Sequence, residues 1–150
     1  MTNELNIHIC RALSNPNSEP IITELKKNNE QATIIEWDID LYERIIKKYY
    51  PDFLQTFLDC EFDIEKAFMG RIFALHKYGG LMISDTMRII KHIDNFLKVV
   101  KDPSDCYIKS SNPHVILFEH FPLDFESFEK ISNHVMLSLP NSKFLSFCIQ

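Results

Sequence analysis

The chain has 150 residues, of which 45% are hydrophobic, and a formal net charge of −5. A chain of this size can bury one core but not two, so residues 1–150 are predicted to form a single domain. Twelve Phe, five Tyr and one Trp argue against a disordered chain. The basic residues are scattered and not clustered, which argues against nucleic acid as the main partner.

The cysteines and the hydropathy pattern point to a reducing compartment. Cys10, Cys60, Cys106 and Cys148 show no Cys-x-x-Cys spacing, so reduced and buried thiols are expected. No apolar stretch approaches the roughly 20 residues of a membrane helix, and the N-terminus lacks the features of a signal peptide. We therefore expect a cytoplasmic protein without a transmembrane segment. The six histidines lack the spacing of a zinc site.

Short strands and amphipathic helices alternate in the first third of the chain. Apolar and polar residues alternate over Leu5–Cys10, and Gln31–Trp37 contains a β-branched run, so both segments are predicted to be strands. A turn-rich loop is expected over residues 15–20. Helices are predicted at Ile21–Asn29 and at Leu41–Tyr49, the second capped by Asp38 or Asp40 and stopped by Pro51.

The clearest helical pattern runs from Ile64 to Tyr78. Asp63 is its expected N-cap, and the apolar residues at helical spacing are predicted to face the core: Ile64, Phe68, Ile72 and Leu75. Gly79 stands where a helix commonly ends with a positive φ. Gly80 then leads into a short buried strand, Leu81–Ile83.

Shorter elements are predicted in the second half of the chain. Strand-like alternation is present at Met87–Ile93, Cys106–Lys109, His114–Phe118 and Val135–Leu139, and helices are expected at Asp94–Val100, from Asp124 through Lys130, and for a turn or two within Asn141–Gln150. Strands that alternate with helices predict an α/β domain with a Rossmann-like sheet.

Two windows, Ile34–Asp40 and Lys66–Thr86, carry a resemblance to a known family. They resemble glycosyltransferases with a sugar-binding Asp-x-Asp region, the group of the yeast-type initiating α-mannosyltransferases and bacterial capsular-polysaccharide transferases. In that family a strand ends in Trp-Asp, and an Asp-x-x-Arg helix runs into Tyr-Gly-Gly, a hydrophobic strand and Asp-x-Asp. The resemblance spans roughly Leu5 to Leu97, and His8 would match a histidine of the family's opening strand.

The resemblance implies a nucleotide-diphospho-sugar transferase (GT-A type) fold. Family members generally continue for another hundred residues or so, which supply the acceptor site. We therefore expect this chain to be truncated to the nucleotide-binding half and a protein partner to supply the acceptor half. The implied ligand is a UDP- or GDP-linked sugar.

The resemblance also implies a set of nucleotide-sugar-binding residues: Arg11, Trp37, Arg71, Gly79, Gly80, Ser84, Asp85 and Thr86. Trp37 is expected to pack against a base, and Arg11 or Arg71 to offset phosphate charge. Three alternatives remain open. The two glycines serve as a helix stop or contact phosphate, Asp85 is a turn carboxylate or a ligand, and Arg71 pairs with Asp85 or with phosphate.

The sequence departs from the family at its acidic positions. Ser84-Asp85-Thr86 aligns with Asp-x-Asp, so both family carboxylates become hydroxyls, and Phe68 replaces the Asp of Asp-x-x-Arg. Because Mn²⁺ and Mg²⁺ prefer carboxylate oxygens, Asp85 is a weak candidate metal ligand, and the cofactor is Mn²⁺ or Mg²⁺ if the protein is active, or none. Two functions remain: transfer of a sugar to a glycan or protein acceptor, or an inactive relative that serves as a binding partner or structural component. No catalytic residue can be named.

Overall fold

The structure, a computed structural model, describes residues 6–11, 18–87, 115–120 and 130–150. The strands β1 (Asn6–Cys10), β2 (Thr33–Trp37), β3 (Gly80–Ser84), β4 (Val115–His120) and β5 (Lys130–Ser138) form one sheet in the order β2-β1-β3-β5-β4. β1 pairs in parallel with both β2 and β3, whereas β5 is antiparallel to β3 and to β4. The predicted α/β class is confirmed, and the sheet is mixed, with two parallel and two antiparallel strand pairs.

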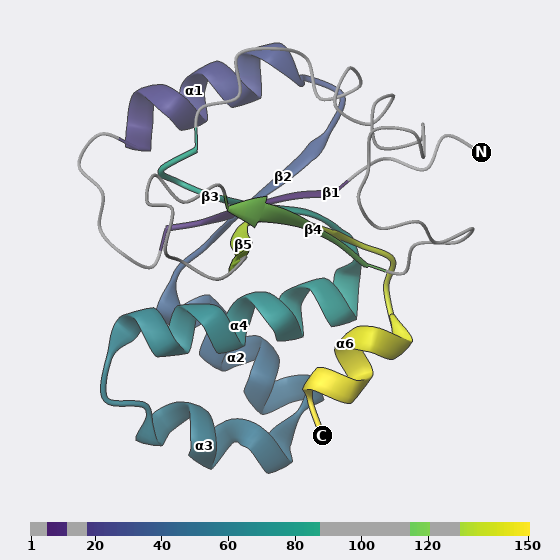
Figure 1. The fold of residues 1–150 in the computed structure, drawn as a ribbon. Helices are drawn as coiled ribbons and strands as arrows, with labels where there is room; N and C mark the ends of the chain where they lie inside the picture. Colours follow the sequence, from purple (N-terminus) through teal and green to yellow (C-terminus); the bar gives the residue numbers. More distant parts are fainter. Residues whose placement is uncertain (1–5, 12–17, 88–114, 121–129) are drawn as a thin grey trace.

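Helices cover the sheet on both faces (Figure 1). Helix α1 (Ser18–Asn28) lies on one face, and α2 (Ile39–Tyr49) and α4 (Asp63–Tyr78) lie on the other. The strands divide their side chains accordingly. One core cluster joins Ile7, Ile9, Ile22, Leu25, Leu81 and Ile83 under α1, and the larger cluster lies on the side of α2 and α4 and includes Cys10, Trp37, Tyr42, Ala74 and Met82.

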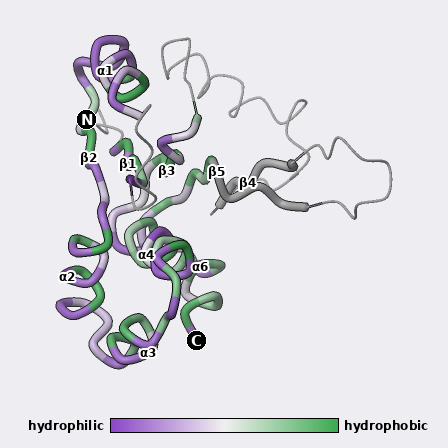
Figure 2. The backbone as a smooth tube through the Cα atoms, turned by 90° about the vertical axis from the view of Figure 1, so that its left-hand side faces the viewer, coloured by the Kyte–Doolittle hydropathy of each residue, from purple (hydrophilic) through white to green (hydrophobic). Residues whose placement is uncertain are grey.

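Helix α2 forms for the reasons its sequence predicts. The Asp38 carboxylate caps it by accepting from the Leu41 amide at 2.8 Å, so the first of the two candidate caps is confirmed. Its buried residues, Tyr42, Ile45 and Ile46, recur at helical spacing, and hydrophobic and hydrophilic positions alternate along the tube in Figure 2. Pro51 then opens the 3₁₀ turn η1 (Pro51–Phe53), as the helix stop requires.

Helix α3 (Leu54–Asp59) has no counterpart among the predicted elements. It has six residues and buries one of them, Phe57, so its amphipathic signal is too short to stand out from the sequence.

The predicted buried face of α4 is confirmed at Leu75, holds in part at Ile72, which packs against the core, and is wrong at Ile64 and Phe68. Ile64 and Phe68 are 43% and 40% exposed, and Ile72 is only half-buried. The face that packs inward carries Ala67, Gly70, Arg71 and Ala74, together with Phe73 and Leu75. This face carries small residues because α2 packs closely against it: a Cβ on Gly70 would lie 2.2 Å from Cγ of Tyr42.

The ends of several elements differ from the prediction. Asp63 is the first residue of α4 rather than its N-cap, and the Glu65 carboxylate accepts from the Phe62 amide at 3.3 Å. α1 begins at Ser18, so the predicted loop over residues 15–20 ends earlier. Lys130 belongs to β5 and not to a helix, because it pairs with His120 across an antiparallel ladder. β5 therefore begins five residues before the predicted Val135.

The remaining predictions divide between confirmed and untested. β4 confirms the strand predicted at His114–Phe118, and α6 (Lys143–Cys148) confirms the final helical turns. The elements predicted within residues 88–109, and the helix from Asp124 up to residue 129, lie outside the described residues.

Three of the four cysteines are described, and all three are free thiols. Cys10 is buried, but Cys60 is half-buried and Cys148 is exposed, so the predicted burial holds only for the strand cysteine. Cys106 lies outside the described residues. Among the helices described, none combines the length and the apolar character needed to cross a membrane.

Candidate functional site

The carboxyl ends of β1 and β3 form the topological switch point of the sheet. The chain leaves β1 through α1 to reach β2, then returns through α2 and α4 on the opposite face to reach β3 on the other side of β1 (Figure 1). Ligands of open α/β sheets bind where the connections diverge in this way. Cys10 pairs with Ser84, and the Asp85 amide donates to the Cys10 carbonyl at 3.3 Å. Arg11 and Asp85 thus follow neighbouring strands at this edge.

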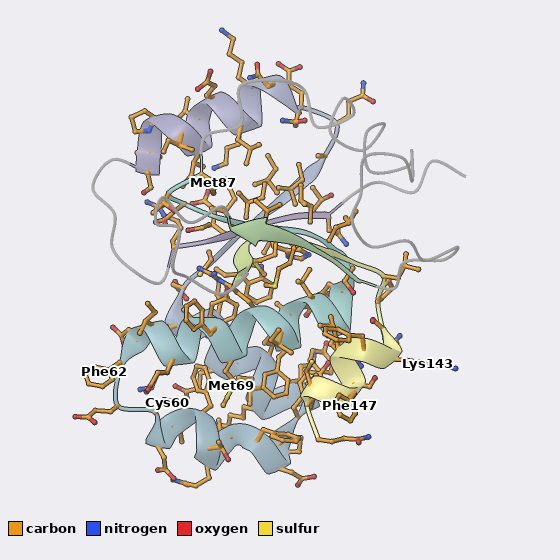
Figure 3. All side chains as sticks on the ribbon, viewed as in Figure 1. Cys60, Phe62, Met69, Met87, Lys143 and Phe147 are labelled. Carbon is orange, nitrogen blue, oxygen red and sulfur yellow. The ribbon has the colours of Figure 1, made fainter. Side chains whose placement is uncertain are left out.

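The turn after β3 places hydroxyls where the resemblance implies carboxylates. Ser84 Oγ and Thr86 Oγ1 are 2.9 Å apart, and the Met87 amide donates to the Ser84 carbonyl at 3.0 Å. Ser84 and Asp85 are each 3% exposed, whereas Thr86 and Met87 are exposed; Met87 marks this edge in Figure 3.

This turn does not fit a divalent cation. Ser84 and Thr86 provide neutral oxygens that bond to each other, which leaves one carboxylate, Asp85, whereas Mg²⁺ and Mn²⁺ are held by carboxylates and phosphates. In the part of the chain that the structure describes, no group of three or more His, Cys, Asp or Glu side chains could hold a metal ion.

Arg11 extends the β1–β2 ladder and turns its side chain into an ion network with α1. Its amide donates to the Trp37 carbonyl at 2.7 Å. Its guanidinium donates to Glu36 Oε2 at 2.6 Å and to Glu19 Oε2 at 3.1 Å, and Lys26 Nζ donates to Glu36 Oε1 at 2.5 Å. The Lys26 ammonium, helped by Arg11, lowers the pKa of Glu36 despite its partial burial.

The opposite face of the same strands is closed. Trp37 is 3% exposed, and its ring stacks on Tyr42 with centroids 5.3 Å apart and an interplanar angle of 3°. Arg71 is 2% exposed, lies beside the Tyr42 hydroxyl, and has its guanidinium carbon 5.4 Å from the centroid of the Phe68 ring. Burial raises the pKa of the Tyr42 hydroxyl.

The resemblance implies that Cys10, Arg11 and Trp37 surround one crevice with Arg71 beneath it, but the sheet places these residues on two faces. Arg11 lies on the α1 side, whereas Cys10, Trp37 and Arg71 belong to the layer of α2 and α4. Trp37 is almost fully buried, and Tyr42 stacks on one face of its ring, so this arrangement leaves no exposed ring face for a base. Arg71 and Asp85 are both buried, and the ion-pair alternative for them stays a prediction.

Gly79 and Gly80 lie at the N-terminal end of β3, whereas Ser84 lies at its C-terminal end. Since β3 begins at Gly80 and rises about 3.3 Å per residue, roughly 13 Å separates the glycines from the switch point. Their φ angles are 61° and 99°, and a Cβ at Gly80 would lie 2.3 Å from the Asn6 carbonyl oxygen. The Gly79 amide ends α4 by donating to Leu75 O at 2.8 Å. Of the two alternatives for these glycines, a helix stop or a phosphate contact, this geometry is that of a helix stop.

His8 of β1 forms hydrogen bonds both to Trp37 of β2 and to Gly79, which follows α4. Trp37 Nε1 donates to His8 Nδ1 at 2.9 Å, so Nε2 carries the proton and donates to the Gly79 carbonyl at 2.7 Å. The ring is fully buried, and burial lowers its pKa. Neither this role nor the network of Glu19 and Glu36 was predicted. An acid near the end of a half-buried strand, as at Glu36, is a signal that could have indicated a charged partner.

Comparisons with known proteins give one informative match. No family model matches the chain, and no solved structure matches it. The chain is 30% identical over 112 residues to the mannosyl phosphorylinositol ceramide synthase of Saccharomyces cerevisiae, an alignment that covers 75% of this chain and 24% of that protein. The chain spans about a quarter of the length of this curated relative. It is thus distantly related to a yeast synthase of mannosyl phosphorylinositol ceramide, in line with the resemblance found in its sequence.

Proposed function

We propose that the carboxyl edge of β1 and β3 binds the diphosphate of a nucleotide-linked sugar, and that the chain is the donor-binding part of a glycosyltransferase-like protein. The similarity to the yeast synthase is the observation that carries this proposal, because a mannosyl compound is built from an activated sugar donor. The switch point supports it by giving this sheet the edge at which phosphate ligands of α/β folds lie. UDP and GDP are the nucleotides to test.

Arg11 is the described cation best placed to meet the diphosphate. It follows β1 directly at the switch point and is 38% exposed, whereas Arg71 is buried under the sheet. A guanidinium offers two parallel donors to phosphate oxygens and offsets the charge that builds up on the leaving diphosphate. The exposed Thr86 hydroxyl adds a neutral donor. Since no carboxylate pair holds a metal here, we expect binding no tighter than roughly millimolar, about −4 kcal/mol.

A non-catalytic binding protein is the second candidate. It is favoured by the hydroxyls at Ser84 and Thr86 and by Phe68, whose ring packs on Arg71 where the family has an acid. In that case the chain would keep the fold and act as a partner or structural component of an active transferase. Acceptor contacts are expected from a protein partner in either case.

Calorimetry with a panel of UDP- and GDP-sugars, with and without Mn²⁺, tests the proposal. We expect weak binding of one nucleotide class and little dependence on Mn²⁺. Absence of binding for every member of the panel, with and without Mn²⁺, would contradict the donor-site proposal and leave the second candidate.

A variant that restores the carboxylates tests whether the turn is a degenerate metal site. Because the Ser84 and Thr86 hydroxyls are 2.9 Å apart, aspartates at these positions would converge on one cation. We expect Ser84→Asp/Thr86→Asp, alone or with Phe68→Asp, to lose stability without metal and to regain it with Mn²⁺. The measurement is the Mn²⁺ dependence of Tm, with the native chain as control. A folded variant indifferent to Mn²⁺ and to nucleotide would show that this turn is no vestigial donor site.

A further inference from the structure

We propose that Glu19 is a built-in competitor of the anionic ligand at the switch point: it occupies one side of the Arg11 guanidinium and must leave when a diphosphate binds. This inference rests on the proposed function and adds to it the group that the ligand displaces. It is carried by the geometry of the network formed by Arg11, Glu19, Lys26 and Glu36.

The two carboxylates that contact Arg11 are held very differently. Glu36 is 27% exposed and uses both of its oxygens, one on Arg11 at 2.6 Å and the other on Lys26 at 2.5 Å. Glu19 is 68% exposed and contacts Arg11 through a single oxygen at 3.1 Å. Release of Glu19 breaks one solvent-exposed contact, whereas release of Glu36 breaks two shorter ones.

Glu36 is therefore the positioning residue and Glu19 the exchangeable one. Glu36 lies in β2, which is fixed by the ladder to β1, so it anchors one edge of the guanidinium to the sheet. The other edge, through Nη2, faces Glu19 in the first turn of α1. A phosphate oxygen that bonds to Nη2 takes the place of the Glu19 carboxylate and leaves the Glu36 contact intact.

The two carboxylates also reduce the attraction of Arg11 for an incoming anion. With Glu19 and Glu36 both in contact, Arg11 faces two negative charges and offers little net attraction to an incoming anion. Removal of Glu19 leaves Arg11 and Lys26 to share Glu36, which is one positive charge in excess. A diphosphate thus gains a binding partner only when Glu19 gives way, and the exchange weakens binding by the strength of an exposed ion pair.

The experiment is an NMR titration of the full chain with UDP and with GDP at fixed, low ionic strength, carried out on the native chain and four variants. Glu19→Gln keeps the shape of the side chain and removes its charge, so we expect affinity to rise roughly two- to fivefold. Arg11→Ala should lower affinity by about tenfold or more, because a charge-assisted contact is lost. Glu30→Gln is the matched control, since Glu30 is an exposed acid in the turn that follows the C-terminal end of α1, and it should leave affinity unchanged.

The double variant Arg11→Ala/Glu19→Gln separates direct exchange from a general charge effect. Without the guanidinium, removal of Glu19 should give no gain over Arg11→Ala. If Glu19→Gln does not raise affinity in the native background, or raises it equally without Arg11, the exchange is overturned while nucleotide binding stands. If none of the five proteins binds UDP or GDP, the proposed function fails and the inference fails with it.

Discussion

At the scale of single residues, His8 shows what a sequence can and cannot reveal. Alternation in Leu5–Cys10 places it in a strand, and the structure confirms the strand. Its two partners, the Trp37 indole and the Gly79 carbonyl, come from segments 29 and 71 residues away. A hydrogen bond across such separations leaves no local pattern, so the neutral, buried state of His8 could not be derived from the sequence.

The pH dependence of stability follows from this buried state. Burial lowers the pKa of folded His8 below 6.5, so the unfolded chain binds a proton first as the pH falls. The free energy of unfolding is thus expected to decline as the pH falls through 6.5, with a smaller contribution from His76, whose pKa burial also lowers.

Urea unfolding at pH 7.5, 6.5 and 5.5 checks this prediction. His8→Gln preserves one acceptor and one donor but cannot titrate, so its stability should decline less over this range. Equal slopes for the native chain and His8→Gln would show that His8 does not carry the effect.

Gly70 is a position at which the structure leaves no room for a larger side chain. Its Cα hydrogen faces the Tyr42 ring, and a Cβ there would overlap three ring carbons at 2.2 to 2.6 Å. We expect Gly70→Ala to lower the free energy of unfolding by about 2 kcal/mol through overpacking, despite the better helix propensity of Ala. In a Tyr42→Leu background the same change should cost less. An equal cost in both backgrounds, measured by urea unfolding, would contradict this contact.

At the scale of elements, the length of α4 was predictable but its orientation was not. The larger apolar residues at helical spacing define one face, yet the helix buries the face of Ala67, Gly70, Arg71 and Ala74. The close packing of α2 against α4 determines which of the two faces is buried, because the Tyr42 ring of α2 fills the space next to Gly70. The identity of the neighbouring helix is not present in the periodicity of α4 itself, so only the tertiary structure selects the face.

This orientation gives a prediction opposite to the one that follows from the expected burial of Phe68. Ala74→Asp places a charge at a position with no exposure, so we expect a loss of more than about 3 kcal/mol or failure to fold. Phe68→Asp alters a residue that is 40% exposed and should cost far less. Thermal unfolding of both variants is the measurement, and a Phe68→Asp variant less stable than Ala74→Asp would contradict the observed face.

At the scale of the whole molecule, the parallel half of the sheet was predictable and the antiparallel half was not. The order strand, helix, strand up to Ser84 leads to β1, β2 and β3 in parallel, as expected. For β5 the alternation of apolar residues predicted a strand from Val135 without a direction, and the first five residues of the strand were not predicted. The direction and the length of β5 are set by its antiparallel pairing with β3 and β4, because a strand can be added to a sheet in either direction.

The candidate site was predicted as one crevice at the carboxyl edge of the sheet, but the sheet places its residues on different faces and at both ends of the strands. Ser84, Asp85 and Thr86 lie at the switch point with Arg11, as expected from strand ends. Trp37 and Arg71 lie under the sheet, and Gly79 and Gly80 lie at its other edge. Which face a strand residue takes depends on register and on the helices that cover each face, and neither is set by spacing along the chain.

Amide chemical-shift mapping with UDP and GDP tests the central claim that the ligand site is the switch point at the carboxyl ends of β1 and β3. We predict that the largest shifts occur at Arg11, Asp85 and Thr86, reach half-saturation at millimolar nucleotide, and need about ten times more nucleotide to reach it in Arg11→Ala. Shifts centred instead on Gly79 and Gly80, at the other end of β3, or no shifts at ten times that concentration, would contradict it.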